Sequence, residues 1–171
     1  AQESSEREIL SLMIQEFKNR FTQLRSETPA EGVKKLSDHQ LLVLASMIEK
    51  ETGTAEDRPL IAGVFHNRLR LGMKMQSDPT VIYGISNFDG NLTREHLETP
   101  TPFNTYTEMG LPPTPISNPG WDSLHSALQP ASVKYLYFVA RGDGSSAFSR
   151  TLREHQRAVW KYQVQPHRNS R

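Results

Sequence analysis

An apolar helical run that ends in two carboxylates constrains this chain more than any other feature. At about 100° per residue, the apolar positions between residues 41 and 52 share one face: Leu41, Leu44, Ala45, Met47 and Ile48. On the same helix, Glu51 lies about 50° from the centre of that face and Glu49 about 105° from it. A carboxyl group on an apolar face loses hydration and resists ionisation. Glu51 is therefore either paired with an arginine such as Arg58 or Arg68, or chemically active.

The composition limits the class of protein. The 171 residues suffice for one domain with a buried core. The 20 Lys and Arg and 19 Asp and Glu leave a net charge of +1, so nothing predicts nucleic acid as a partner. No apolar run approaches the roughly 18 to 20 residues of a membrane span, and no secretory signal is visible. The chain has no cysteine, which excludes thiolate metal sites, disulfides and cysteine nucleophiles.

Apolar residues spaced by three and four predict helices in the first half of the chain. One covers residues 4–24, with Ser4 or Ser5 as its N-cap. The next begins after Ser37, whose capping-box partner is Gln40, and ends at Gly53. A third covers residues 54–72. These helices predict a mainly α protein.

The connection after the third helix carries several polar residues. Gln76 is expected in the loop itself. Ser77 or Asp78 can then cap a short helix that has Pro79 at its first position.

Residues 85–119 are rich in Asn, Gly, Thr and Pro, which predicts an ordered loop without regular structure. A loop of this length within a compact domain is more often functional than idle. The alternative is a flexible linker between two domains, but Phe103, Tyr106, Leu111 and Ile116 resemble anchors that a disordered linker lacks. We expect the loop to wrap over the helices and to form the wall of a groove.

The last part of the chain predicts a helix, a hairpin and a final helix. The helices are expected at residues 118–128 and 151–160, and the strands at 135–140 and 146–149. The fold class is therefore mainly α (α+β), with a small β-hairpin and a long Pro-rich loop. The expected organisation is an N-terminal helix and loop at 1–36, a catalytic domain at 37–165, and a frayed basic tail at 166–171. Because the chain opens at Ala1 without an initiator Met, we expect a processed or truncated piece of a longer protein.

Motifs of several common chemistries are absent from the sequence. It contains no His-Glu-x-x-His, no Gly-x-Ser-x-Gly and no phosphate-binding Gly-x-x-x-x-Gly-Lys. The six histidines lack the spacing of metal ligands, so no metal site is expected. The remaining candidate chemistry is general acid catalysis, because a carboxyl group with a raised pKa can protonate a glycosidic oxygen. A glycosidase usually pairs that acid with a second carboxylate. Asp78 is the nearest candidate in sequence, with a helix N-cap as its alternative role.

Short segments of the chain, taken in order, resemble the catalytic domain of the MltG-type (YceG-like) endolytic murein transglycosylases. They lie at residues 45–52, 64–84, 97–100, 103–106, 110–113, 116–120 and 135–139. The resemblance extends over about residues 37–160. It implies a lysozyme-like domain that acts on the glycan strands of peptidoglycan.

The resemblance also implies a mechanism. The catalytic acid of the family is the second glutamate of Glu-Lys-Glu-Thr, which is Glu51 here. Cleavage of the MurNAc-β-1,4-GlcNAc bond would be non-hydrolytic and would leave a 1,6-anhydro-MurNAc end, with Glu51 as acid and then as base. Because the substrate supplies the nucleophile, neither a metal nor a cofactor is required. Met75 and Gln76 are similar to part of the Gly-Leu-Met-Gln segment of other lytic transglycosylases, which implies that Gln76 contacts sugar amides or hydroxyls.

The remaining candidates for sugar binding are polar and aromatic. We expect Asp78, Tyr83, Asn104, Tyr106 and Tyr137 to hold the sugar, although each tyrosine could equally belong to the core. Two other functions stay open. One is a lysozyme-type hydrolase in which Asp78 positions water, and the other is a non-catalytic peptidoglycan-binding scaffold module.

The resemblance carries expectations about location and partners. Members of the family are usually anchored by one N-terminal membrane helix and carry a LysM-like domain before the catalytic one, and this chain shows neither. We expect the full-length protein to be membrane-anchored and this domain to lie on the periplasmic or extracytoplasmic face of the bacterial cytoplasmic membrane. Cell-wall synthases are candidate partners.

Overall fold

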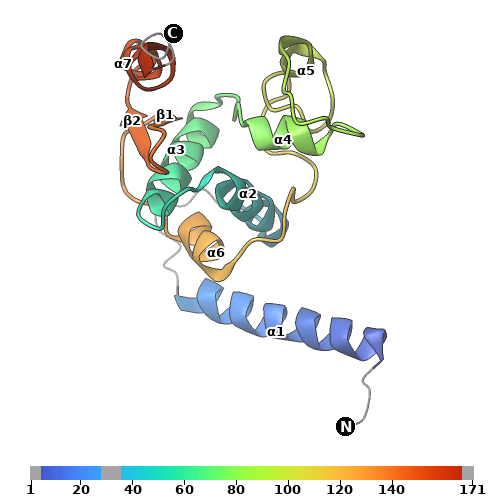
Figure 1. Cartoon of the computed structure of the whole chain (residues 1–171). Helices are drawn as coiled ribbons and strands as arrows, with labels where there is room; N and C mark the ends of the chain where they lie inside the picture. Colours follow the sequence, from blue (N-terminus) through green and yellow to red (C-terminus); the bar gives the residue numbers. More distant parts are fainter. Residues whose placement is uncertain (1–4, 28–35, 167–171) are drawn as a thin grey trace. The chain divides into compact units, whose positions relative to one another are not determined.

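The computed structural model describes residues 5–27 and 36–166 (Figure 1). The expected cap at Ser4, most of the loop before residue 36, and residues 167–171 of the basic tail lie outside these ranges. The chain divides into two compact units, Ala1–Gly32 and Val33–Arg171. The domain boundaries expected at residues 36 and 166 stay predictions.

The described residues of the first unit form helix α1 (Glu6–Glu27), in the region where the apolar spacing predicts a helix. Ser5 caps this helix, because its hydroxyl accepts from the Glu8 N–H at 3.3 Å while the Glu8 carboxylate accepts from the Ser5 N–H at 2.8 Å. No helix among the described residues combines the length and apolar character that spanning a membrane requires.

The second unit is built around α2 (Asp38–Glu51), which lies beside α3 (Asp57–Leu71) and α6 (Trp121–Leu128) (Figure 1). The predicted capping box of Ser37 and Gln40 is present at its start. Six apolar side chains of α2 are at most 1% exposed, namely those of Leu41, Val43, Leu44, Ala45, Met47 and Ile48. At about 1.5 to 3 kcal/mol for each large side chain, their burial makes α2 the centre of the core.

The end of α2 differs from the prediction. The helix ends at Glu51, followed by Thr52, whose hydroxyl donates to the Ile48 carbonyl at 2.6 Å. Gly53 is needed for close packing instead of for a left-handed cap. A Cβ atom there would lie 2.1 Å from the carbonyl oxygen of Gly144. Only a residue without a side chain allows the two backbones to approach this closely.

The connection from α3 to α4 (Asp78–Tyr83) follows the sequence pattern closely. Gly72 ends α3 with φ 65°, and its N–H reaches carbonyls of the last turn. Pro79 lies in the first turn of α4.

The region between residues 85 and 119 contains one helix that the composition did not predict, α5 (Arg94–Glu98). The expectation of loop throughout is wrong there, because Thr93 and His96 form a reciprocal capping box that starts a helical turn. The rest is loop, and its last part contacts α2. The Ile116 N–H donates to Ser46 Oγ at 3.0 Å, and the Ser117 hydroxyl donates to the Ser46 carbonyl at 3.0 Å.

A hairpin and a C-terminal helical segment complete the second unit. Strand β1 (Tyr137–Ala140) pairs antiparallel with β2 (Ser146–Ser149), with Phe138 opposite Phe148. Helix α7 (Leu152–Val159) packs on the hairpin and continues into a π-helical turn, η1 (Trp160–Val164), so the helical segment extends beyond the predicted residue 160. The mainly α (α+β) class with one small hairpin is confirmed.

Candidate active site

Glu51 is the last residue of α2, and its side chain lines a cavity of about 500 Å³. The lining comes from α2, α3, the connection to α4, the Pro-rich loop, the hairpin and the C-terminal helices. It includes Arg68, Gln76, Asp78, Tyr106, Tyr137, His155 and Gln163. The cavity therefore gathers residues from distant parts of the chain around one carboxyl group.

The carboxyl group of Glu51 accepts a hydrogen bond of 2.6 Å from the Ser77 hydroxyl at Oε1. Loss of hydration on burial is the largest influence on it and raises its pKa to about 7. The Ser77 hydrogen bond opposes this rise, while the negative charge of Asp78 adds to it. The positive charge of Arg68 has a smaller, lowering effect. A group with this pKa exchanges a proton readily near neutral pH.

Ser77 is held in place by two buried threonines. Its N–H donates to Thr105 Oγ1 at 3.0 Å, and its carbonyl accepts from the Thr80 hydroxyl at 2.7 Å. The hydroxyls of Thr80 and Thr105 lie 2.8 Å apart. Ser77 occupies the N-cap position of α4 but makes no capping bond with its side chain, because its hydroxyl is directed to Glu51. The sequence identified Ser77 as a possible cap and missed this contact.

Arg68 projects from α3 and is only 6% exposed. Its Nε donates to the Leu136 carbonyl at 2.7 Å, and its Nη1 donates to the carbonyls of Lys74 at 3.1 Å and Met75 at 2.9 Å. Its guanidinium carbon lies 5.1 Å from the ring centroid of Tyr137. Arg68 therefore ties α3 to both the Gln76 connection and the chain leading into β1.

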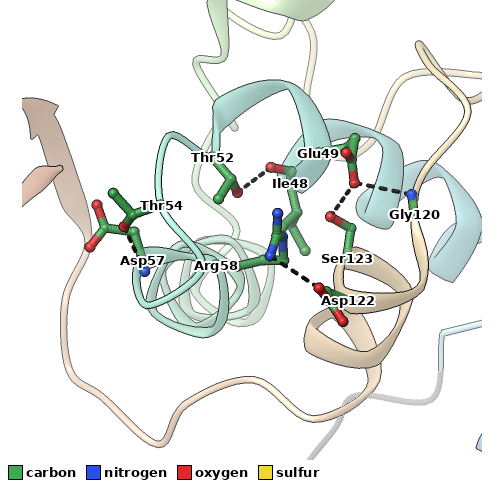
Figure 2. Close-up of polar contacts among 9 residues, drawn as sticks. All are labelled: Ile48, Glu49, Thr52, Thr54, Asp57, Arg58, Gly120, Asp122 and Ser123. Atoms are coloured by element: carbon green, nitrogen blue, oxygen red, sulfur yellow. Dashed lines mark hydrogen bonds and ion pairs between the residues drawn. The ribbon is translucent and has the colours of Figure 1, made fainter. Parts of the chain in front are cut away.

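The two arginines considered as partners of Glu51 do not pair with it directly. Among the described residues, no ion pair within 4 Å joins either of them to this carboxyl group. Arg58 Nη1 instead lies 3.6 Å from Asp122 Oδ2 at the start of α6 (Figure 2). Glu51 is thus a carboxyl group with a hydroxyl partner and a more distant cation.

Asp78 is an exposed residue at the rim of the same cavity, where it accepts a hydrogen bond of 2.5 Å from the Tyr106 hydroxyl. Burial is the first cause, and the bond to Asp78 the second, of a raised pKa for Tyr106. Asp78 does not cap α4, since Ser77 holds the cap position and the Asp78 side chain makes no capping bond. The interpretation of Asp78 as a helix cap is therefore wrong.

Gln76 has a backbone conformation that is uncommon for a residue with a side chain, with φ 50°. Its N–H donates to the Thr105 carbonyl at 3.1 Å, and its side-chain oxygen accepts from Arg68 Nη1 at 3.1 Å. Strained positions of this kind persist where their surroundings fix them, and they are frequent at functional sites.

A family model described as the YceG-like family matches residues 1–161. This chain belongs to the YceG-like family.

Similar proteins agree with this assignment. An endolytic murein transglycosylase of Bacillus subtilis strain 168 is 39% identical over 160 residues, which cover 94% of this chain and 44% of that protein. An endolytic murein transglycosylase of Streptococcus pneumoniae strain D39 is 36% identical over 132 residues, covering 74% and 24%. A crystal structure of a yceG-like protein from Listeria monocytogenes aligns with a TM-score of 0.68 and 39% identity, covering 85% of this chain and 44% of that one. The chain thus spans less than half the length of these relatives.

The tyrosines expected to bind sugar separate into two places in this YceG-like chain. Tyr106 and Tyr137 line the Glu51 cavity, and the Tyr137 ring stacks on His155 with centroids 5.2 Å apart. Tyr83 is 51% exposed, packs on Phe103 and lines a separate hollow of about 300 Å³.

Asn104 is fully buried and does not line the cavity. Its amide nitrogen donates to the Thr99 carbonyl at 2.7 Å and to the carbonyls of His96 and Leu97 at 3.1 Å. Its side-chain oxygen accepts from the Tyr106 N–H at 2.9 Å. The expectation that Asn104 holds sugar is wrong because its side chain has no exposed surface and its amide bonds fold the loop.

Glu49 is two residues, or about 200° of helical rotation, before Glu51, so the two side chains leave opposite sides of α2. Figure 2 shows Glu49 directed to Gly120 and Ser123. Its Oε2 accepts from the Ser123 hydroxyl at 2.6 Å and the Gly120 N–H at 3.0 Å. The Ser123 hydrogen bond is the main reason that its pKa lies below the ordinary value. Glu49 joins α2 to the start of α6, a structural role that its marginal helical position did not predict.

Proposed function

We propose that this chain is the catalytic part of an endolytic murein transglycosylase. The reaction would cleave the MurNAc-β-1,4-GlcNAc bond of peptidoglycan glycan strands without water and leave 1,6-anhydro-MurNAc ends. The observation that carries the proposal is Glu51, a partly buried carboxyl group with a pKa of about 7 at a cavity of about 500 Å³. The family and the names of its relatives support the choice of substrate.

The proposed reaction needs one group that is first an acid and then a base. Protonated Glu51 gives its proton to the glycosidic oxygen as the bond from that oxygen to MurNAc C1 breaks. The resulting carboxylate takes the proton of the C6 hydroxyl of the same MurNAc while O6 forms a bond to C1. Protons and bonds balance, and Glu51 ends protonated again. A pKa near 7 suits both steps, because neither form of the group is strongly favoured.

The neighbours of Glu51 support both protonation states. Burial stabilises the neutral acid, whereas the Ser77 hydroxyl stabilises the carboxylate formed after the first proton transfer. We assign Gln76, Asp78, Tyr106 and Tyr137 to the sugars next to the cleaved bond, since all four line the cavity. Tyr83 lies outside it, and we assign its exposed ring to a more distant sugar of the strand.

A lysozyme-type hydrolase is the second candidate. One observation favours it, namely the Asp78 carboxylate on the same cavity as Glu51, oriented by the Tyr106 hydroxyl. In that reaction Asp78 would position water, and the product would carry an ordinary reducing end.

Location and partners follow from the proposed substrate. We infer that the domain acts on the periplasmic or extracytoplasmic face of the cytoplasmic membrane, in a membrane-anchored full-length protein, with cell-wall synthases as candidate partners. Localisation of the tagged full-length protein by cell fractionation tests this inference. Recovery in the cytoplasmic fraction alone would contradict it.

Mass spectrometry of the products tests the reaction. We expect purified glycan strands incubated with this chain to yield fragments that end in 1,6-anhydro-MurNAc. Fragments with reducing-end MurNAc would instead identify the hydrolase. Binding of strands without any cleavage would favour a non-catalytic scaffold module.

A further inference from the structure

The helical segment formed by α7 and η1, which packs beside the hairpin, has two different faces (Figure 1). One face, which includes His155, lines the same cavity as Glu51. Arg153 and Arg157 each lie two residues, or about 200° of helical rotation, from His155, so their side chains leave the opposite face. Trp160 follows Arg157 by three residues and continues that face. We call Arg153, Arg157 and Trp160 the outer face.

Positive charge is concentrated on this segment. Residues 150–166 contain four Lys or Arg and one acidic residue, whereas the net charge of the whole chain is only +1. The acidic residue, Glu154, is used at the start of α7, where its carboxylate accepts from the N–H groups of Arg150 and Thr151. Within the described ranges, none of the four cations forms an ion pair. All four are exposed, namely Arg150, Arg153, Arg157 and Lys161.

The two arginines of the outer face are placed unfavourably for the helix itself. Arg153 lies in the first turn of α7, where the positive end of the helix dipole disfavours a cation. Arg157 follows four residues later, and like charges at this spacing repel each other. An anion bound to this face would relieve both effects. Local conflicts of this kind are expected at functional surfaces, which indicates a partner that supplies negative charge.

Trp160 adds an apolar group to the charged face. It is 51% exposed, and Val164, four residues further along the chain, is 41% exposed. A large apolar ring beside a guanidinium group gains little from a soluble polyanion. It fits the boundary between lipid headgroups and acyl chains, where Trp residues accumulate and basic amphipathic helices bind.

We propose that the outer face of α7 and η1 docks on an anionic lipid bilayer. Arg153 and Arg157 bind lipid phosphates, while the Trp160 ring enters the headgroup region. Because the residues that line the cavity leave the opposite face of the same helix, docking does not cover them. The inference concerns a surface apart from Glu51 and does not depend on the proposed reaction.

Sedimentation of this chain with lipid vesicles tests the proposal. One set of vesicles contains phosphatidylcholine alone, and the other contains equal parts of phosphatidylcholine and phosphatidylglycerol. The double variant Arg153→Gln/Arg157→Gln removes two positive charges from the outer face. The double variant Arg20→Gln/Arg94→Gln is the matched control, because it removes two positive charges from exposed residues elsewhere. Circular dichroism verifies folding, and calorimetry measures binding of soluble polyphosphate.

We expect binding to the mixed vesicles only, with a dissociation constant that increases with ionic strength because salt screens these charges. The outer-face double variant should weaken binding about thirtyfold more than the control does, since each cation near an anionic surface contributes about fivefold. Trp160→Ser should weaken binding to the mixed vesicles and leave binding to polyphosphate unchanged.

Several results would overturn the inference. Equal binding to the two kinds of vesicle would exclude an anionic surface as the partner, and equal losses in the two double variants would exclude the outer face as the site. Absence of binding to the mixed vesicles would also overturn it. Binding of polyphosphate, together with vesicle binding that does not depend on Trp160, would identify a soluble polyanion as the partner instead. None of these results depends on cleavage of glycan strands, so the proposed function is tested separately.

Discussion

Glu49 and Glu51 are both glutamates near the end of α2, yet their surroundings give them different roles. Glu49 faces the start of α6, where a hydroxyl and an N–H donate to it and its pKa is lowered. Glu51 faces a cavity, where loss of hydration outweighs one hydrogen bond and its pKa is raised to about 7. The comparison teaches that the number of donors and the access of water, more than the residue type, determine whether a glutamate holds a fold together or moves protons.

The largest expected effect is on activity. We expect Glu51→Gln to lower kcat/KM on glycan strands by about 10²- to 10⁴-fold, because the amide can neither give nor take the proton. Glu49→Gln is the matched control and should leave kcat/KM within about threefold once folding is verified, since its partners are structural. Release of soluble fragments measures both. Equal losses in the two variants would remove the proposed distinction between the two glutamates.

The next prediction concerns the pH dependence of stability. Because the pKa of Glu51 is higher in the folded than in the unfolded chain, its contribution is fully present below pH 4.5 and is lost as pH rises to about 7. The free energy of unfolding of Glu51→Gln should therefore rise by up to about 3 kcal/mol relative to that of the wild type across that range. Glu49→Gln should show the opposite trend, losing stability relative to wild type as pH rises above the folded pKa of Glu49. Denaturant unfolding at several pH values measures both, and parallel curves would contradict the prediction.

Ser77 donates to Glu51 and Ser123 donates to Glu49, so each hydrogen bond can be removed separately. Ser77→Ala removes the hydrogen bond that stabilises the Glu51 carboxylate, so the pKa should rise further and the alkaline limb of the kcat/KM profile should move up by about one pH unit. Ser123→Ala removes the corresponding bond to Glu49 and should leave that limb unchanged while lowering stability by about 1 kcal/mol. If the alkaline limb of the kcat/KM profile does not move in Ser77→Ala, Glu51 is not the titrating group.

The smallest expected effect lies at the edge of the Glu49 contact. Asp122→Asn removes the partner of Arg58, but the Asp122 side chain is 76% exposed and the atoms are 3.6 Å apart (Figure 2). We expect the free energy of unfolding to change by less than about 0.5 kcal/mol, because exposed ion pairs contribute little. A loss above about 1 kcal/mol in denaturant unfolding would mean that the pair is part of the α2–α6 contact.

The features that the sequence predicted are those that depend on neighbours within one turn. Ser37 and Gln40 predict the start of α2, and Gly72 predicts the end of α3. The helical angle of Glu51 predicts its different environment without any knowledge of its partners. The family resemblance supplied Gln76, which does line the same cavity.

The features that the sequence missed depend on residues far apart in the chain. Ser77 meets Glu51 across 26 positions, and Ser123 meets Glu49 across 74. Sequence periodicity does not indicate such a contact, so the sequence predicts only the local role of Ser77 as a helix cap. The prediction that Asn104 binds sugar was wrong for a related reason. A polar residue in a loop is equally suited to binding a ligand and to satisfying the carbonyls of its own loop.

The close approach of Gly53 and Gly144 has a mechanical consequence. Gly53 follows the helix that carries Glu51, and Gly144 lies in the turn of the hairpin that carries Tyr137. Main-chain atoms therefore set the distance between two elements that both line the cavity. Repacking of core side chains leaves this backbone contact intact, whereas a single methyl group at position 53 would push the hairpin turn away from the end of α2.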